Sequence, residues 1–414
     1  MKRYNKIITL LSLSAMAAGF PSCSMMTEDN EDCPEGLYVR FVYDYNTQRA
    51  DMFKDHVGHV KLMVFDTEGN KVAEKEVSNT TDSHPLQEYG YAIHFDTSEL
   101  APGTYRLQAV GMQRDWEEAE ATAGAKYRRN EVSRHDELHI SLDHSAETIA
   151  GTDQYAVSDA APLDTLWHTL KVMSRIPQDG NTLPPMDRTS KPYTVYPLED
   201  QYVSIVANHA TYATMSMIRD TKHLNITLRE LDDPAGVSAD KYEVKITDKN
   251  AHLAHDNAVE THEKVRYTPY ASWTSRFLDN GLVEIETVHK GNPGQYHAAA
   301  TADGAAETVQ RTAHYNVMFN RLMHNDTDNA DNAILEITNK ETGKVVAHIN
   351  LPSILAQGRN AYDIYNYSHQ EYLDREYDYH LDFFLKGDKW LYCDIVVNAV
   401  SYTHLRAHET LSDL

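Results

Sequence analysis

The stretch Val60-Lys61-Leu62-Met63-Val64-Phe65-Asp66-Thr67-Glu68-Gly69-Asn70 joins a β-strand pattern directly to a turn. Residues 60–65 are mostly β-branched, aromatic or other apolar types, which favour a strand that packs one face on a core. Residues 66–70 are of the types that tolerate positive φ or hydrogen-bond to their own backbone. The stretch therefore predicts a strand that turns back into an antiparallel neighbour.

The same pattern recurs along the chain, and helical signals are confined to 352–357 and 368–375. Short strands separated by turns predict an all-β protein made of β-sandwiches. Strands are predicted in the first half at 37–43, 60–65, 91–95 and 104–110. In the second half they are predicted at 215–218, 224–228, 242–246, 283–287, 315–322, 334–338, 345–349, 379–385 and 392–397.

A proline-rich polar stretch at 177–197 separates the two blocks of strands. Clustered prolines with Asn, Asp and Ser are typical of a linker, and a chain of this length exceeds one typical core. We therefore expect two tandem β-sandwich domains, at 34–190 and 198–400.

The composition limits the possible partners. Lys and Arg number 38 and Asp and Glu number 62, so the formal net charge is −24. Nucleic acid and anionic membrane surfaces repel such a chain, so neither is expected to bind it.

Residues 1–22 have the features of a secretory signal peptide, with Lys2 and Arg3 before the uncharged apolar stretch 7–20. Phe20-Pro21-Ser22-Cys23 resembles the lipobox of bacterial lipoproteins and predicts a lipid on Cys23. Two or more acyl chains hold a protein durably on a membrane. The alternative is an ordinary signal peptide followed by an incidental cysteine. Residues 23–33 then form a polar acidic leash that has little to bury.

Cys33 and Cys393 lie at opposite ends of the folded part. An exported pair can form a disulfide, but the sequence does not show whether their Cα atoms come close enough. Two buried free thiols remain the alternative.

No motif indicates catalysis or a cofactor, so we expect a protein that is not an enzyme and name no catalytic residue. His252-Leu253-Ala254-His255-Asp256 is the best histidine cluster, but no further ligand has a recognisable spacing. Residues 326–331 resemble a calcium loop that lacks the required oxygen ligand and glycine. We therefore expect no metal site.

The last residues differ in character from the rest. Ser401-Tyr402-Thr403-His404-Leu405-Arg406-Ala407-His408-Glu409-Thr410 resembles a translated sequencing-adapter fragment. We interpret 401–414 as a non-native tail and draw no function from its histidines.

Several segments together resemble the FimB/Mfa2 family of fimbrial anchor lipoproteins of Bacteroidetes. The resemblance begins at Cys33-Pro34-Glu35-Gly36-Leu37-Tyr38-Val39-Arg40-Phe41, continues through 60–69 and Pro102-Gly103-Thr104-Tyr105, and reaches Gln370-Glu371-Tyr372-Leu373-Asp374-Arg375-Glu376-Tyr377. It implies two transthyretin-like Greek-key sandwiches behind a lipidated N-terminus. It also implies that the protein holds the base of a fimbrium to the outer membrane and joins fimbrillin-type subunits by strand addition. The adapter-like tail stands where that resemblance leads us to expect a continued last strand.

A surface glycan-binding lipoprotein is the alternative function. It would share the signal peptide, leash and sandwiches, but would need exposed aromatic platforms. The four tryptophans are scattered through the chain instead, at Trp116, Trp167, Trp273 and Trp390.

Replacing Cys23 tests the lipid anchor. Cys23→Ala should abolish labelling by an alkyne fatty acid and release the protein from the membrane fraction, because no thiol remains for the diacylglycerol. Undiminished label on the variant would contradict the lipoprotein interpretation.

Overall fold

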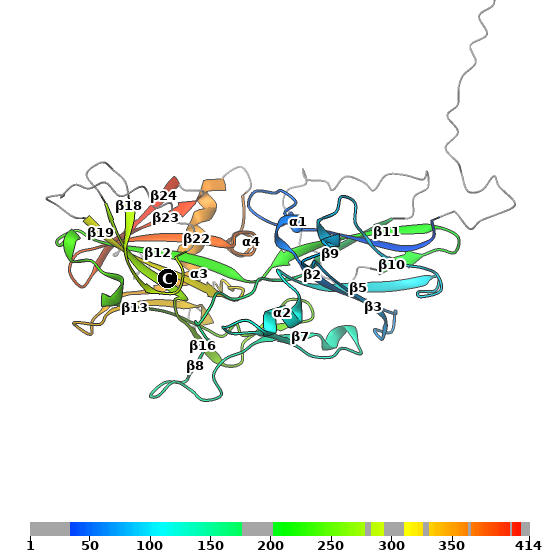
Figure 1. The fold of residues 1–414 in the computed structure, drawn as a ribbon, viewed down its shortest axis with the longest axis horizontal. Helices are drawn as coiled ribbons and strands as arrows, with labels where there is room; N and C mark the ends of the chain where they lie inside the picture. Colours follow the sequence, from blue (N-terminus) through cyan, green and yellow to red (C-terminus); the bar gives the residue numbers. More distant parts are fainter. Residues whose placement is uncertain are drawn as a thin grey trace, which may run out of the picture.

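The computed structural model of the protein describes residues 34–175, 202–277, 283–293, 310–325, 331–362, 366–397 and 400–406. Its described part consists mainly of β-strands in sheets of eight, seven, five and four strands. The two largest sheets lie end to end along the long axis, with the smaller strands around β7, β8 and β16 below them (Figure 1). The all-β fold class predicted from the sequence is confirmed.

The first large sheet is built mainly from the N-terminal part of the chain, in the order β3-β2-β5-β9-β11-β1-β4, and β10 also pairs with β5. β1 runs parallel to β11, and the other pairs are antiparallel. Apolar side chains such as Val39, Leu62 and Met215 are each 0% exposed and share one core. The strands are β1 (Gly36–Val42), β2 (His59–Phe65), β3 (Lys71–Ser78), β4 (Ile93–Phe95), β5 (Gly103–Met112), β9 (Leu166–Arg175), β10 (Tyr202–Ile205) and β11 (Ala210–Arg219).

The turn between β2 and β3 has the predicted chemistry. The Asp66 carboxylate accepts hydrogen bonds from the backbone N–H groups of Glu68, at 2.9 Å, and Asn70, at 2.8 Å. Gly69 has a φ of 85°, which favours glycine because it has no Cβ. The hairpin predicted from residues 60–70 is therefore confirmed.

The second large sheet has the order β18-β17-β19-β12-β22-β23-β24. It also contains one parallel pair, β12 with β22, among antiparallel neighbours. The strands are β12 (Lys222–Glu230), β17 (Ala271–Phe277), β18 (Val283–Lys290), β19 (Gln310–Phe319), β22 (Asp378–Leu385), β23 (Trp390–Val397) and β24 (Val400–Arg406).

Both smaller sheets combine strands from distant parts of the chain. β7 pairs antiparallel with β14, and β8 pairs parallel with β16. The five-stranded sheet contains β21 (Val345–Asn350), β20 (Ile334–Asn339), β13 (Tyr242–Asp248), β16 (Lys264–Tyr267) and β8 (Gln154–Ala156). The four-stranded sheet contains β15 (Val259–Glu260), β14 (His252–Ala254), β7 (His139–Leu142) and β6 (Tyr127–Arg129). One hydrophobic core consequently extends from Met63 to Val397.

Helices are short. α4 (His369–Arg375) begins after Ser368, whose hydroxyl accepts a hydrogen bond from the N–H of Glu371 at 3.1 Å. Within the described ranges, no helix has both the length and the apolarity needed to cross a bilayer. The other α-helices are α1 (Phe53–His56), α2 (Trp116–Glu120) and α3 (Leu351–Leu355), and the 3₁₀ segments are Pro85–Gln87, His135–Glu137, Pro234–Gly236, Ala239–Lys241 and Ala356–Tyr362.

The expected domain limits, 34–190 and 198–400, do not coincide with the sheets. Residues 177–197 lie outside the described residues, but β10 and β11, which follow them, pair with β5, β9 and β1 of the first sheet. The chain enters the second large sheet at β12, directly after Asp220-Thr221. Clustered prolines disfavour regular structure locally, but they do not determine which sheet the next strand joins.

Cleavage within 177–197 should therefore cut the chain without dividing the protein. β11 pairs with β9 at eight positions and with β1 at seven, so the two pieces should remain associated. Native size-exclusion chromatography of the protein, cut at a protease site inserted there, should give one peak, and denaturing electrophoresis two bands. Separate native peaks would show that these pairings do not hold the pieces together.

Candidate functional site

Of the three cysteines that the sequence singled out, the structure describes only Cys393. Cys23 lies outside the described residues, so the lipid site stays a prediction. Cys393 lies on β23, is 0% exposed and has a free thiol, and because Cys33 lies outside the described residues, the possible disulfide between the two stays a prediction. Burial raises the pKa of the Cys393 thiol well above its usual value, which makes it unreactive.

The outer edge of β23 carries an added strand. β23 pairs antiparallel with β22 on one side and with β24 on the other. The ladder with β24 extends from Val397↔Val400 to Tyr392↔Arg406, with one register shift between Ile395 and Val396. Residues 401–406 of β24 belong to the segment that the sequence analysis separated as a tail.

Packing holds β23 firmly from its inner side. Phe384 of β22 stacks on Tyr392 with a centroid separation of 4.3 Å, and Phe383 meets Trp390 edge-on at 5.9 Å. Neighbouring Asp382 accepts from Arg229 at 3.2 Å. Burial acts to raise the pKa of Asp382, but hydrogen bonds and the charges of His380 and Arg229 outweigh it and lower that pKa. β23 is thus a fixed template.

The edges at β3 and β18 are less suited to another strand. β3 carries ion pairs at 2.7 Å between Lys71 and Glu74 and between Lys75 and Glu99. β18 is irregular, because its ladder with β17 shifts register twice. Charged side chains and bulges are the devices by which sheets discourage edge-to-edge pairing.

Helix α4, which contains part of the 370–377 segment, lies at the joint between the two large sheets. Asp374 accepts two hydrogen bonds from Arg321, both at 2.8 Å. Arg375 is 0% exposed, with its guanidinium carbon 4.0 Å from the centroid of the Tyr45 ring. Burial disfavours the Arg321 cation, but Asp374 outweighs it and raises the pKa of Arg321 above its usual range.

Buried polar contacts also hold Asp220 and Lys222, which lie where the chain passes from β11 of the first large sheet to β12 of the second. Asp220 lies 2.6 Å from Nδ1 of His168 and accepts from Asn257 at 2.8 Å. Lys222 donates at 2.9 Å to the backbone carbonyls of both Asp374 and Glu376. Burial lowers the pKa of Lys222 to about 8. These contacts tie β12 to α4 and to β9.

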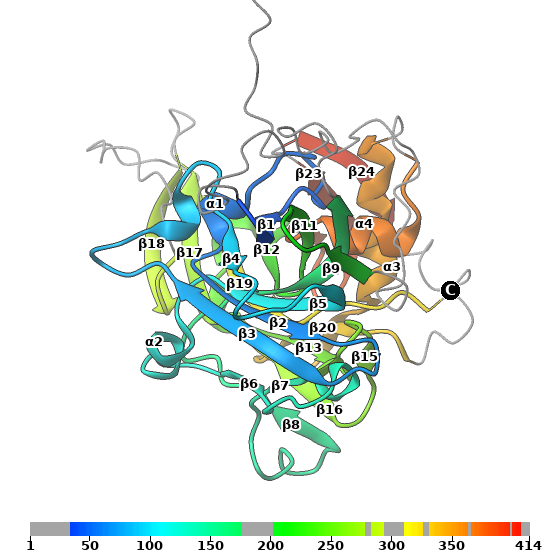
Figure 2. The same cartoon turned by 90° about the vertical axis from the view of Figure 1, so that its right-hand side faces the viewer.

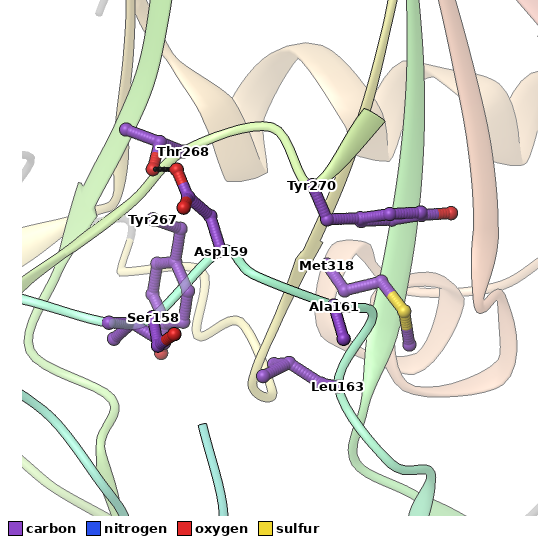
Figure 3. A pocket seen from close by; sticks show the side chains of 9 residues that line it. Ser158, Asp159, Ala161, Leu163, Tyr267, Thr268, Tyr270 and Met318 are labelled. Carbon is purple, nitrogen blue, oxygen red and sulfur yellow. Dashed lines mark hydrogen bonds between the residues drawn. The ribbon is translucent and has the colours of Figure 1, made fainter. Parts of the chain in front are cut away.

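Two small hollows lie on the described surface. One, of about 220 Å³, is lined by Asp159, Leu163, Thr268, Tyr270, Met318 and neighbouring residues (Figure 3). Its polar groups are already paired, since Asp159 accepts from Thr268 and contacts Lys290. A second measures about 260 Å³.

The tryptophans do not form platforms for sugars. Trp116 and Trp390 are each 9% exposed, Trp273 is 2% exposed and Trp167 is 1% exposed. Buried indoles cannot stack on a glycan, so the observation that would favour the glycan-binding alternative is missing at these four residues.

The histidines that the sequence singled out do not act together. His252 lies on β14, whereas His255 follows that strand and packs against His135, with centroids 5.8 Å apart. The structure instead brings His252 to His144 and Glu263, which no local spacing could have indicated. Of the calcium-like segment 326–331, only Asp331 is described, and it pairs with Lys249 at 2.8 Å.

Three solved structures from Bacteroides have this fold. A candidate adhesin from Bacteroides thetaiotaomicron has a TM-score of 0.61 and 22% identity, over 91% of this chain and 99% of that one. A candidate polysaccharide-binding protein from the same species has a TM-score of 0.59 and 23% identity, over 91% and 99%. A candidate adhesin from Bacteroides ovatus has a TM-score of 0.56 and 20% identity, over 91% and 97%. The chain thus has the all-β architecture of this class of Bacteroides proteins.

The sequence also matches a family model. Residues 30–403 match the family described as fimbrillin-A associated anchor proteins Mfa1 and Mfa2. No curated protein matches the chain. The chain belongs to this family of fimbrial anchor proteins, and its role is a fimbrial one.

The stability of the joint around α4 should depend on the charge of Asp374. Asp374→Asn leaves the buried Arg321 without its partner and should lower the free energy of unfolding by about 3 kcal/mol. Urea unfolding measures the loss. Asp153→Asn is the control, because Asp153 pairs with Lys264 at the surface, with 70% of its side chain exposed. An equal loss in both variants would show that the joint has no special weight.

Proposed function

We propose that the protein anchors the base of a fimbrium to the outer membrane through a lipid on Cys23. We further propose that it joins a fimbrial subunit by strand addition along the outer edge of β23. Membership of the anchor family, over residues 30–403, carries the first part of the proposal. The ladder along the outer edge of β23 supports the second.

Strand addition suits an anchor because it needs no catalytic group. Main-chain hydrogen bonds provide affinity, and pockets for alternate side chains provide specificity. Cys393 and Ile395 of β23 are 0% and 2% exposed, so the strand is seated in the core and its outer backbone can bear a partner. In this proposal a subunit strand takes the position that residues 401–406 occupy along β23.

The proposed attachment is a passive one. The carboxylate in one hollow, Asp159, is already engaged by Thr268 and Lys290. We therefore propose that the protein acts by binding and not by catalysis, with fimbrillin-type subunits as partners at the cell surface.

A complementation experiment tests both parts of the proposal. Deleting the gene should release fimbriae into the medium while synthesis of their subunits continues, and the wild-type gene should restore retention. Val396→Pro removes a backbone N–H from β23 and should restore retention poorly. Val72→Pro, on the edge strand β3, should restore it fully, since Val72 is likewise on a sheet edge and 45% exposed.

The readout is the ratio of cell-bound to released fimbriae, with thermal melts of both variants as the folding control. Fimbriae retained by the deletion strain would refute the anchor function. Full retention by Val396→Pro, at a wild-type melting temperature, would refute the β23 edge and leave the anchor function intact.

A further inference from the structure

Three side chains from distant parts of the chain converge beside the four-stranded sheet. His252 projects from β14, His144 follows β7, and Glu263 directly precedes β16. One ligand atom of each lies within 4.8 Å of the others, and all three side chains are half-buried. β7, β8, β15 and β16 lie together at this lower end of the molecule (Figure 2).

The partners of His144 determine its tautomer. Nδ1 of His144 lies 3.0 Å from the backbone carbonyl of Ser145. A carbonyl oxygen only accepts, so Nδ1 carries the proton and Nε2 presents a lone pair. This is the arrangement found in metal-binding histidines, whose second nitrogen usually donates to a carbonyl or carboxylate.

A continuous chain of polar contacts connects Glu263, His252, His139 and Glu260. Glu263 lies 2.8 Å from Nε2 of His252, whose Nδ1 lies 3.1 Å from Nε2 of His139. Nδ1 of His139 in turn lies 3.1 Å from the Glu260 carboxylate. His139 is thus the outer partner of His252, and Glu260 lies next to His139.

We propose that a divalent transition-metal ion, Zn²⁺ by preference, binds to Nε2 of His144, Nε2 of His252 and the carboxylate of Glu263. Two imidazoles and a carboxylate form a ligand set that zinc accepts, and water completes the tetrahedron. His252 then donates from Nδ1 to His139, which donates to Glu260. Ca²⁺ fits poorly because it prefers six to eight oxygen ligands.

The three side chains must adjust to bind one ion, because their ligand atoms lie within 4.8 Å of one another. Zinc ligands at about 2.0–2.2 Å from the ion are separated by somewhat more than 3 Å, so the 2.8 Å contact of Glu263 with His252 must widen slightly. Glu263 can move, since 39% of its side chain is exposed. His252 is 15% exposed and is held by His139, so it provides the fixed part of the site.

Binding would tie two sheets together. His144 packs against Tyr155 of β8, with ring centroids 4.8 Å apart, and Glu263 adjoins β16 of the same five-stranded sheet. His252 belongs to the four-stranded sheet. A ligand that binds only the folded state stabilises it, so Zn²⁺ should raise the melting temperature.

Zinc titration of the mature, untagged protein tests the proposal after chelator treatment. Calorimetry should show one tight site per chain and a rise in melting temperature. His144→Gln and Glu263→Gln should remove the tight site, and His139→Gln should weaken it by about 10–100-fold, as for other outer partners of metal ligands. His348→Gln is the matched control, because His348 also lies near a glutamate, at 3.3 Å from Glu336, and has 62% of its side chain exposed.

Retention of the tight site by both His144→Gln and Glu263→Gln would overturn the proposal. So would its equal loss in His348→Gln, or weak binding of several ions that every variant shares, since the chain has 22 histidines. Fimbrial retention is not part of this test, so its outcome is independent of the anchor function.

Discussion

The structure depends on the two buried residues through which the chain passes from the first large sheet to the second. Asp220 and Thr221, each 0% exposed, carry the chain from β11 of the first large sheet into β12 of the second. Such a short link leaves the two sheets little freedom to move relative to each other. Hydrogen bonds restrict it further, because Asp220 contacts His168 and Asn257, and Lys222 donates to two backbone carbonyls of the segment around α4. These groups are buried, so hydrogen bonds within the protein replace those that their polar atoms would make to water.

The link between β11 and β12 also connects the two parallel strand pairs one after the other along the chain. β1 lies parallel to β11, β11 leads into β12, and β12 lies parallel to β22, the neighbour of β23. A pull on the N-terminal end of β1 against the edge of β23 would draw β1 and β11 in opposite directions along their axes. The hydrogen bonds of each ladder would then bear the force together and not one after another. The topology thus suits the proposed attachment, in which the lipid and the subunit lie at opposite ends of this path.

Short sequence patterns predicted turns and helices correctly, but they did not predict structure that depends on contacts between distant residues. The turn at 66–70 and the helical segment at 368–375 are determined by neighbouring residues, so the sequence predicted them. The sheet that β11 joins is determined by pairing with β1 and β9, which the proline-rich stretch does not encode. His252 and His255 formed the best histidine cluster in the sequence, but His252 lies on a strand that ends at Ala254, and His255 packs against His135 instead. Its actual neighbours, His144 and Glu263, come together only in the folded chain.

Buried charges are a costly way to gain stability, because each ion must be desolvated and an apolar joint can be as stable or more so. Buried charge pairs are better suited to fixing the relative orientation of the elements that they join. The fork of Arg321, just after β19, meets Asp374 with two parallel hydrogen bonds, which hold α4 in one orientation on the second large sheet. From there Glu376 accepts a hydrogen bond from Thr47, which follows β1, at 3.0 Å, and strands β7 and β8 pair with β14 and β16 on the other side. The two large sheets are therefore joined as one bracket of fixed angle, which is what a fimbrial protein needs if force is to pass through it without bending it.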